Sequence, residues 1–148
     1  MITEADVVRI LRDITLYQLG EYPPGLLERE LEHFLSEAED RICQTLWRNG
    51  VSCYRSWMEV WVSGERGFND ELWNLEMMAR RTGGKVARKL VELMKLSKDI
   101  YLAKTLDDKI ALVDRVIHAE HGYGKIIDVD IDEARKKAEE EVKKYLKR

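Results

Sequence analysis

Two of the three histidines of this 148-residue chain lie close together in the sequence, where they could bind a metal ion. His118 and His121 are three residues apart near the end of a predicted helix, and Asp114 lies one turn earlier on the same side. Two imidazoles and a carboxylate form the ligand set of several divalent transition-metal sites, which a second helix would have to complete here. The simpler interpretation, which we favour, is that histidines in a last turn interact with the helix dipole and its free carbonyl groups.

Two glutamates fall on helix faces that are otherwise apolar. Glu120 lies in the stripe of Leu106, Ile110 and Ile117, and Glu76 lies among leucine and alanine residues of another helix. A buried carboxylate is costly unless it is paired or hydrogen-bonded, so each is expected to have an Arg or Lys partner or to lie at a rim. The alternative is that Glu120, aided by Glu76, joins the histidines as a metal ligand or acts as a catalytic carboxylate.

Two further patterns have metal-site spacing but lack required residues. Glu30 and His33 have the Glu-x-x-His spacing of di-iron bundles, which need two such pairs and two more inward-facing glutamates. Residues 128–139 have the spacing of a calcium loop, but Glu133 stands where the turn requires glycine. A divalent transition metal is therefore the one cofactor that the sequence leaves open.

Aromatic and sulfur-containing side chains are concentrated in the middle of the chain. Five of them are candidates for a ligand pocket or a partner-binding surface, namely Trp57, Trp61, Trp73, Met77 and Met78. The commoner use of such residues is to fill the core. If they exceed what one core of this size can hold, the excess predicts an interface between copies of the chain.

A basic segment follows these residues. Its cations flank the pair Gly83-Gly84 before a predicted helix, and they are Arg80, Arg81, Lys85, Arg88 and Lys89. A helix N-terminus among cations can hold a phosphate group, so the segment is a candidate for phosphate or nucleic-acid binding. It lacks the other residues of a phosphate-binding loop, and a net charge of −3 is unusual for a nucleic-acid-binding domain. Nucleic acid is therefore a disfavoured partner that stays open.

Charge is unevenly distributed along the chain. Residues 1–40 carry ten acidic and three basic residues, whereas residues 80–104 carry eight basic and two acidic ones. Such an asymmetry indicates either a nucleic-acid face or two surfaces that meet within the fold or within an oligomer. We favour the second explanation.

Apolar residues recur every three to four positions through most of the chain, which predicts α-helices. The predicted helices cover residues 3–19, 25–48, 51–62, 69–82, 85–103, 105–122 and 130–146. Thr3, Thr105 and Asp130 are expected to cap three of them, and Asn69 or Asp70 to cap a fourth.

Two segments are less regular. Residues 51–62 are rich in aromatic and β-branched residues, so a strand is the alternative to a helix there. Residues 123–129 are predicted to be a loop or extended chain.

Together these elements predict an all-α, single-domain bundle of six or seven amphipathic helices. The length suits one domain, and the apolar and charged fractions of 45% and 36% are those of a globular chain. Residues 1–122 are expected to form the core bundle. Residues 123–148 are expected to add an extended segment and a loosely packed helix, whose thin apolar stripe suits a surface or a partner chain.

Composition also bears on where the protein works. Cys43 and Cys53 lie among apolar neighbours and are predicted to be reduced core residues of a cytoplasmic protein. No apolar run is long enough to span a membrane, and the first residues have the pattern of an amphipathic helix rather than a signal peptide. No membrane partner is therefore expected. The many Glu, Lys and Arg residues and the few amides are typical of thermophilic proteins.

The favoured function is a non-catalytic helical interaction or assembly protein that forms homo-oligomers or binds another protein. The alternative is a small helical metal-binding protein or enzyme with a site around Asp114, His118, Glu120 and His121. Nucleic-acid binding through residues 80–89 is the third hypothesis. We favour a protein that is not an enzyme.

Overall fold

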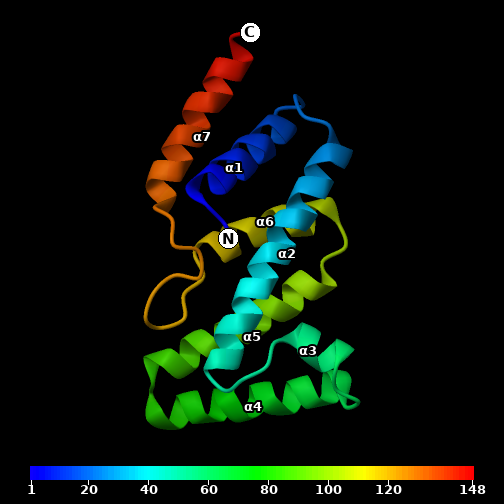
Figure 1. Cartoon of the computed structure of the whole chain (residues 1–148), viewed down its shortest axis with the longest axis vertical. Helices are drawn as coiled ribbons and strands as arrows, with labels where there is room; N and C mark the ends of the chain where they lie inside the picture. The colour runs from blue at the N-terminus through cyan, green and yellow to red at the C-terminus, as the bar shows by residue number, and fades with distance from the viewer.

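The computed structural model describes residues 1–148 and consists of seven α-helices without a β-sheet (Figure 1). The helices are α1 (Glu4–Gln18), α2 (Pro24–Arg48), α3 (Tyr54–Glu59), α4 (Gly64–Thr82), α5 (Lys85–Leu102), α6 (Leu106–Ile117) and α7 (Ile131–Leu146). The all-α bundle predicted from the sequence is confirmed. No helix combines the length and the apolar character that crossing a bilayer requires.

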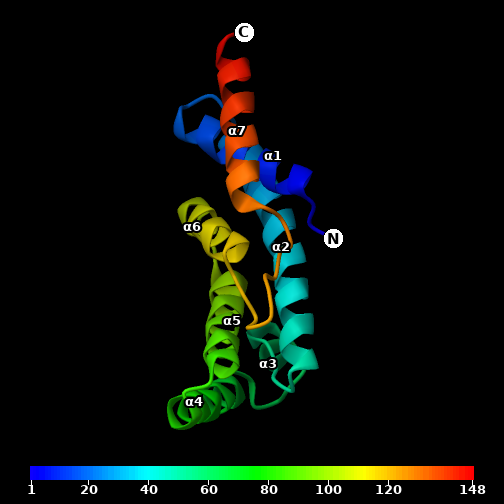
Figure 2. The ribbon, with the colours of Figure 1, turned by 90° about the vertical axis from the view of Figure 1, so that its left-hand side faces the viewer.

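The molecule is elongated, and its longest helix, α2, runs along much of its length (Figure 1). At one end α1 packs on α2, and α7 lies beside α1. At the opposite end α5 contacts α2, α3 and α4, and α4 lies across the end of the molecule (Figure 2). Between the two ends, α6 contacts both α2 and α5.

The core is built along one face of α2. Its buried apolar side chains recur every three to four residues and are Leu27, Leu31, Phe34, Leu35, Ala38, Ile42 and Leu46. They belong to one continuous hydrophobic cluster to which every helix contributes. Burying each large side chain contributes about 1.5–3 kcal/mol. The stripe along α2 therefore holds the two ends of the molecule together.

Three of the predicted helix caps are present. Thr3 forms a capping box with Asp6, and the side chains of Thr105 and Asp130 each accept a hydrogen bond from the backbone N–H three residues on. These bonds satisfy donors that the first helical turn leaves free. Local chemistry is enough to start α1, α6 and α7.

The C-terminal helix has the predicted thin stripe but is not loosely packed. Its buried side chains are Ile131, Ala134, Ala138 and Val142. α1 and α7 make the most extensive helix–helix contact in the molecule, and ion pairs join Lys137 to Glu4 and Arg12 to Glu141. The apolar stripe of α7 is thin because it consists partly of small alanines, which suit close packing against α1. It does not indicate that α7 lacks a partner within the chain.

Two boundaries in the middle of the chain differ from expectation. Within residues 51–62 the chain forms only the short helix α3, so the strand alternative is wrong. α4 begins at Gly64 and not at a cap formed by Asn69 or Asp70. The reason is packing: the ring of Trp57 occupies the space that a side chain at Gly67 would take, 2.2 Å from the ideal Cβ position. Tertiary contact stabilises the early turns of α4, which have no side-chain cap.

The sixth helix ends five residues earlier than predicted, at Ile117 instead of Gly122. Beyond it the chain folds back on itself. The backbone N–H of Ile126 donates to the carbonyl oxygen of Ala119 at 3.0 Å, and that of His121 donates to Gly124 at 3.0 Å. Pairing with the returning chain replaces the last helical turn.

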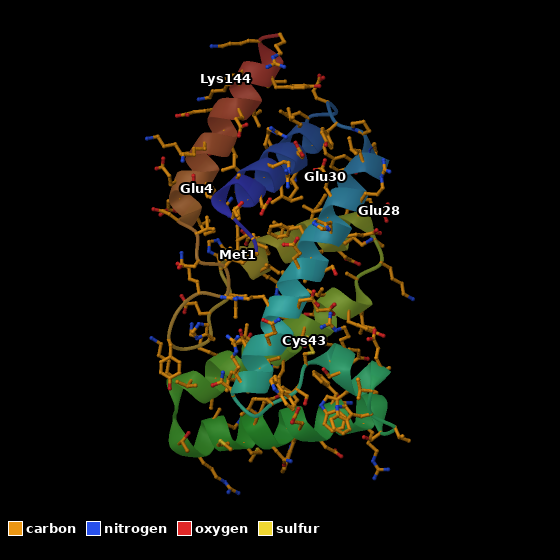
Figure 3. The ribbon with its side chains drawn as sticks, in the orientation of Figure 1. Met1, Glu4, Glu28, Glu30, Cys43 and Lys144 are labelled. Atoms are coloured by element: carbon orange, nitrogen blue, oxygen red, sulfur yellow. A yellow bond between two sulfur atoms is a disulfide. The ribbon has the colours of Figure 1, made fainter.

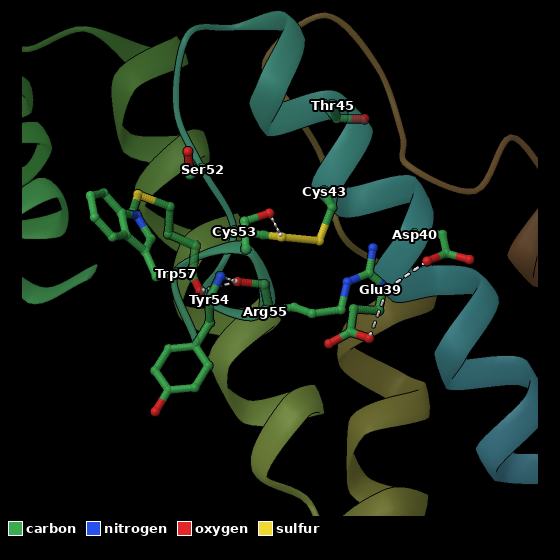
Figure 4. Close-up of a disulfide and its surroundings, with 12 residues drawn as sticks. Glu39, Asp40, Cys43, Thr45, Ser52, Cys53, Tyr54, Arg55 and Trp57 are labelled. Carbon is green, nitrogen blue, oxygen red and sulfur yellow. Dashed lines mark hydrogen bonds and ion pairs between the residues drawn. A yellow bond between two sulfur atoms is a disulfide. The ribbon is translucent and has the colours of Figure 1, made fainter. Parts of the chain in front are cut away.

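Cys43 and Cys53 form a disulfide, with their Cα atoms 5.1 Å apart (Figure 4). The prediction of two reduced cysteines is therefore wrong. The turn at Asn49-Gly50 reverses the chain after α2, where the Val51 N–H donates to the carbonyl oxygen of Leu46, and this brings residue 53 back beside α2. The disulfide ties the start of α3 to the last turns of α2.

The contact between Trp57 and Gly67 predicts a large effect of a small substitution. Gly67→Ala should destabilise the protein by about 1–3 kcal/mol, because the new methyl group overlaps the Trp57 ring. Urea unfolding followed by circular dichroism measures the free energy of unfolding. Gly25→Ala is the matched control: no atom lies within 4 Å of its ideal Cβ, so it should be neutral or slightly stabilising. Equal stability of the two variants would contradict the packing described here.

Candidate functional site

Of the predicted metal ligands around the histidines, the structure brings Asp114 and His118 close together, and it engages Asp114 and His121 in other interactions. His118 is the residue at which α6 ends, and His121 lies beyond the helix. Asp114 accepts a hydrogen bond from Arg135 of α7 at 2.8 Å, and His118 Nε2 is 3.7 Å from the same carboxylate. The nitrogen Nδ1 of His121 accepts the backbone N–H of Tyr123 at 3.3 Å.

The two glutamates that were candidate ligands also lie apart. Glu120 does not lie on an apolar helix face as predicted, because α6 ends at Ile117 and Glu120 is exposed beyond it. It forms an ion pair with Lys89 at 2.6 Å, and this lysine holds the pKa of Glu120 below its usual value. Glu76 lies on α4, in a groove between α4 and α5. No three His, Cys, Asp or Glu side chains in the chain lie together so that they could hold a metal ion. The metal hypothesis thus receives no support from the geometry.

The basic segment surrounds the turn between α4 and α5. Lys89 is paired with Glu120, whereas the other four cations are exposed: Arg80, Arg81, Lys85 and Arg88. The adjacent groove, of about 400 Å³, is lined by Glu76 and Glu92 as well as by Arg80 and Arg88. Acidic and basic side chains balance there, so the groove is not an anion site of the kind that phosphate binding requires. Phosphate or nucleic-acid binding by these residues stays a prediction.

Many acidic residues of the first forty are neutralised within the fold. The ammonium group of Lys109, itself buried, lies 3.2 Å from Glu28 and 3.1 Å from Glu32, and these carboxylates raise its pKa against the effect of burial. Arg55 reaches both Glu39 and Asp40 (Figure 4). The charge asymmetry is thus partly resolved inside the molecule, but the basic partners come from outside residues 80–104.

Of the five aromatic and methionine candidates, Trp57 has a structural role. Its indole N–H donates to Glu71 at 3.0 Å, and its ring packs on Gly67. Trp61 lies against it, with the ring centres 5.6 Å apart, and is half exposed. Sequence reasoning could not separate these two residues, because both fit the same helical stripe.

The remaining three candidates lie on α4, away from the core. Leu75 is buried, and Trp73 and Met77, two positions before and after it, lie on the opposite side of the helix. Trp73 is 63% exposed and Met78 is 55% exposed. Val60 and Val62, in the turn before α4, are also largely exposed. We refer to Val60, Trp61, Val62, Trp73, Met77 and Met78 as the aromatic end.

A pair of acidic side chains that sequence reasoning missed lies at the other end of the molecule. Asp13 of α1 is fully buried, and Glu30 of α2 lies between the two helices (Figure 3). The Tyr22 hydroxyl donates to Oε1 of Glu30, and Arg12 donates to Oδ1 of Asp13 at 2.9 Å. The other two oxygens, Oδ2 of Asp13 and Oε2 of Glu30, are buried and have no other partner.

We infer that these two oxygens share a proton. Burial, together with the hydrogen bond to Asp13, raises the pKa of Glu30 to about 7. A protonated Glu30 donates to Asp13, so that neither buried oxygen is left unsatisfied. We call Asp13, Tyr22 and Glu30 the carboxyl clasp. It joins α1, the following turn and α2, and Arg12 extends it to Glu141 of α7.

The carboxyl clasp lies beside a groove. Glu30 borders a groove of about 490 Å³ between α1 and α2, with Arg9, Arg29 and His33 among its other lining residues. Oε1 of Glu30 is already bonded to Tyr22, and Oε2 is buried. One feature of the sequence indicates the carboxyl clasp. Asp13 lies three residues after Ile10 and is therefore on the buried face of its helix.

The carboxyl clasp predicts a dependence of stability on pH. The pKa of Glu30 is raised from 4.5 to about 7, so the folded chain keeps a proton that the unfolded chain releases. The contribution is fully present below pH 4.5 and is lost as pH rises to about 7. Glu30→Gln retains a donor to Asp13 but cannot ionise, so its free energy of unfolding should fall less across this window. Urea unfolding at a series of pH values measures both profiles.

Glu21→Gln, at an exposed position in the same turn, is the control and should follow the wild-type profile. Identical profiles for Glu30→Gln and wild type would show that no proton is held between the two carboxyl groups.

No known protein family, no curated protein and no solved structure matches this chain. Its function has to be argued from its own residues.

Proposed function

We propose that the protein is a non-catalytic assembly protein that associates with copies of itself through the aromatic end. The observation that supports this proposal is the exposure of large apolar side chains. Two of the four tryptophans, Trp61 and Trp73, are about half exposed or more there, and Val60, Val62 and Met78 add to them. Exposed apolar surface of this kind marks interaction sites in soluble proteins.

The residue types fit an interface better than a ligand pocket. Tryptophan combines a large apolar ring with one N–H donor, and it is enriched among residues that dominate binding energy. Trp73 lies on the outer side of α4, and the groove beside that helix is lined by other residues. A convex helix face at the end of an elongated molecule is accessible to a flat partner surface (Figure 1).

The alternatives have less support. A metal-binding or catalytic site around Asp114, His118, Glu120 and His121 would require side chains that are engaged elsewhere to converge. Four exposed cations near the α4–α5 turn are the support for the nucleic-acid hypothesis. Salt-dependent binding of an oligonucleotide would test it.

We also propose a cytoplasmic location in a thermophilic cell. Disulfides are rare in the cytoplasm of most cells but common in intracellular proteins of hyperthermophiles. The composition rich in Glu, Lys and Arg is consistent with such a source.

Replacement of the most exposed tryptophan of α4 tests the proposal. Wild-type protein should dimerise as its concentration rises, and Trp73→Lys should weaken that association about tenfold or more, because a buried interface anchor is replaced by a charge. Sedimentation velocity over a concentration series measures both. Tyr123→Lys is the matched control, since Tyr123 is 81% exposed in the loop before α7 and outside the aromatic end.

A wild-type chain that remains monomeric at the highest attainable concentration would contradict the proposal. So would a dimer that is equally sensitive to the two substitutions.

A further inference from the structure

The outer side of α4 carries a continuous seam. Phe68, Leu75 and Ala79 are buried on the inner side. Residues on the outer side follow one another at intervals of four, three, four and three, and they are Arg66, Asp70, Trp73, Met77 and Arg80. This spacing places them along one line of a helix, as in helices that pack against a partner helix. No other element of the chain covers this side of α4 (Figures 1 and 2).

The charged residues of the seam have no partner within the chain. Asp70 and Arg80 are both exposed, and neither takes part in an ion pair. Glu65, on the same helix, is by contrast paired with Lys98 of α5. Arg66 is exposed and in no ion pair as well, so the seam offers one free anion, Asp70, and two free cations, of which Arg80 lies ten positions from Asp70.

The order of these residues is symmetric about position 75. Asp70 and Arg80 lie five positions on either side of it, and Trp73 and Met77 lie two positions on either side. If two such helices pack antiparallel about a two-fold axis at this point, each Asp70 faces Arg80 of the other copy. Each Trp73 then faces Met77 of the other copy, a favourable contact between sulfur and an aromatic ring.

We infer that the occupant of the aromatic end is a second copy of this chain, bound through antiparallel α4–α4 packing with reciprocal Asp70–Arg80 ion pairs. The inference rests on the proposed function and names its partner and register. A two-fold interface uses the same patch on both copies, so each favourable contact occurs twice. An axis at Trp73 instead would set Arg66 opposite Arg80, a pair of like charge.

The size of the contact sets the expected affinity. α4 has 19 residues and is about 28 Å long. One pair of helices buries less surface area than a standard stable protein–protein interface. The dimer should therefore be weak, with a dissociation constant in the micromolar range. Val60, Trp61 and Val62, which precede the helix in sequence, are exposed as well.

Charge reversal gives a test that only this register passes. Asp70→Arg places like charges opposite each other at both ends of the seam, and so does Arg80→Asp. Each single variant should therefore bind itself at least about tenfold more weakly than wild type. The double variant Asp70→Arg/Arg80→Asp should recover wild-type association, because both pairs are restored with opposite sign. Sedimentation velocity at matched concentrations measures all four proteins.

Mixing the two single variants is the most direct test of the proposed Asp70–Arg80 pairing. In a mixed dimer both pairs are attractive, so Asp70→Arg and Arg80→Asp should associate with each other although neither associates with itself. Glu21→Arg and Lys104→Asp reverse exposed charges elsewhere and should leave the wild-type dimer unchanged. Circular dichroism serves to check that the variants fold, which is expected because the substituted positions are exposed.

The outcomes distinguish the inference from the proposed function. A wild-type dimer that Trp73→Lys weakens but the charge reversals do not would overturn the register while the assembly function stands. A wild-type chain that stays monomeric would overturn both the register and the assembly function. The same holds if a monomeric chain binds anionic vesicles or an oligonucleotide through α4.

Discussion

The structure depends on the packing of a single helix, α2, against neighbours at both of its ends. Its apolar stripe runs from Leu27 to Leu46, and α1, α6 and α5 contact it in turn along the molecule. A chain of this size would otherwise have to bury two smaller cores, and the cost of ordering each backbone segment would be harder to offset. Continuity along α2 makes the elongated shape compatible with one core.

The two ends of the molecule satisfy their polar and apolar groups differently. At the α1–α7 end, the carboxyl clasp buries one oxygen each of Asp13 and Glu30, and Arg12 and Lys137 connect the helices through ion pairs. At the α4 end, Trp73 is exposed and Asp70 and Arg80 have no intrachain partner. The first end is held together by these polar contacts, and Leu19, Leu26 and Leu146 are its exposed apolar side chains. The second has the surface that a partner would complete, and this contrast is the basis of the assembly proposal.

Features governed by neighbours in sequence were predictable. The periodic stripe of α2 and the caps at Thr3, Thr105 and Asp130 depend on residues within one or two turns, and the structure confirms them. The outward position of Trp73 was less certain, because a large aromatic residue on a mostly apolar helix is equally consistent with the core.

Features that depend on contacts between segments brought together by chain reversals or helix packing were not predictable. The disulfide depends on the reversal at Asn49-Gly50, which brings Cys53 to Cys43. The early end of α6 depends on pairing between residues 119 and 126, and that end removes His121 from the helix. The carboxyl clasp needs α1 and α2 side by side, so Glu30 could be read from sequence only as half of an incomplete metal motif.

Small-angle X-ray scattering over a concentration series tests the central claim, association through α4, most directly. α4 lies across one end of an elongated molecule (Figure 1), so two copies joined there extend in opposite directions. The maximum dimension of the dimer should therefore approach twice that of the monomer. A dimer whose maximum dimension is close to that of the monomer would indicate side-by-side association, and it would contradict the account.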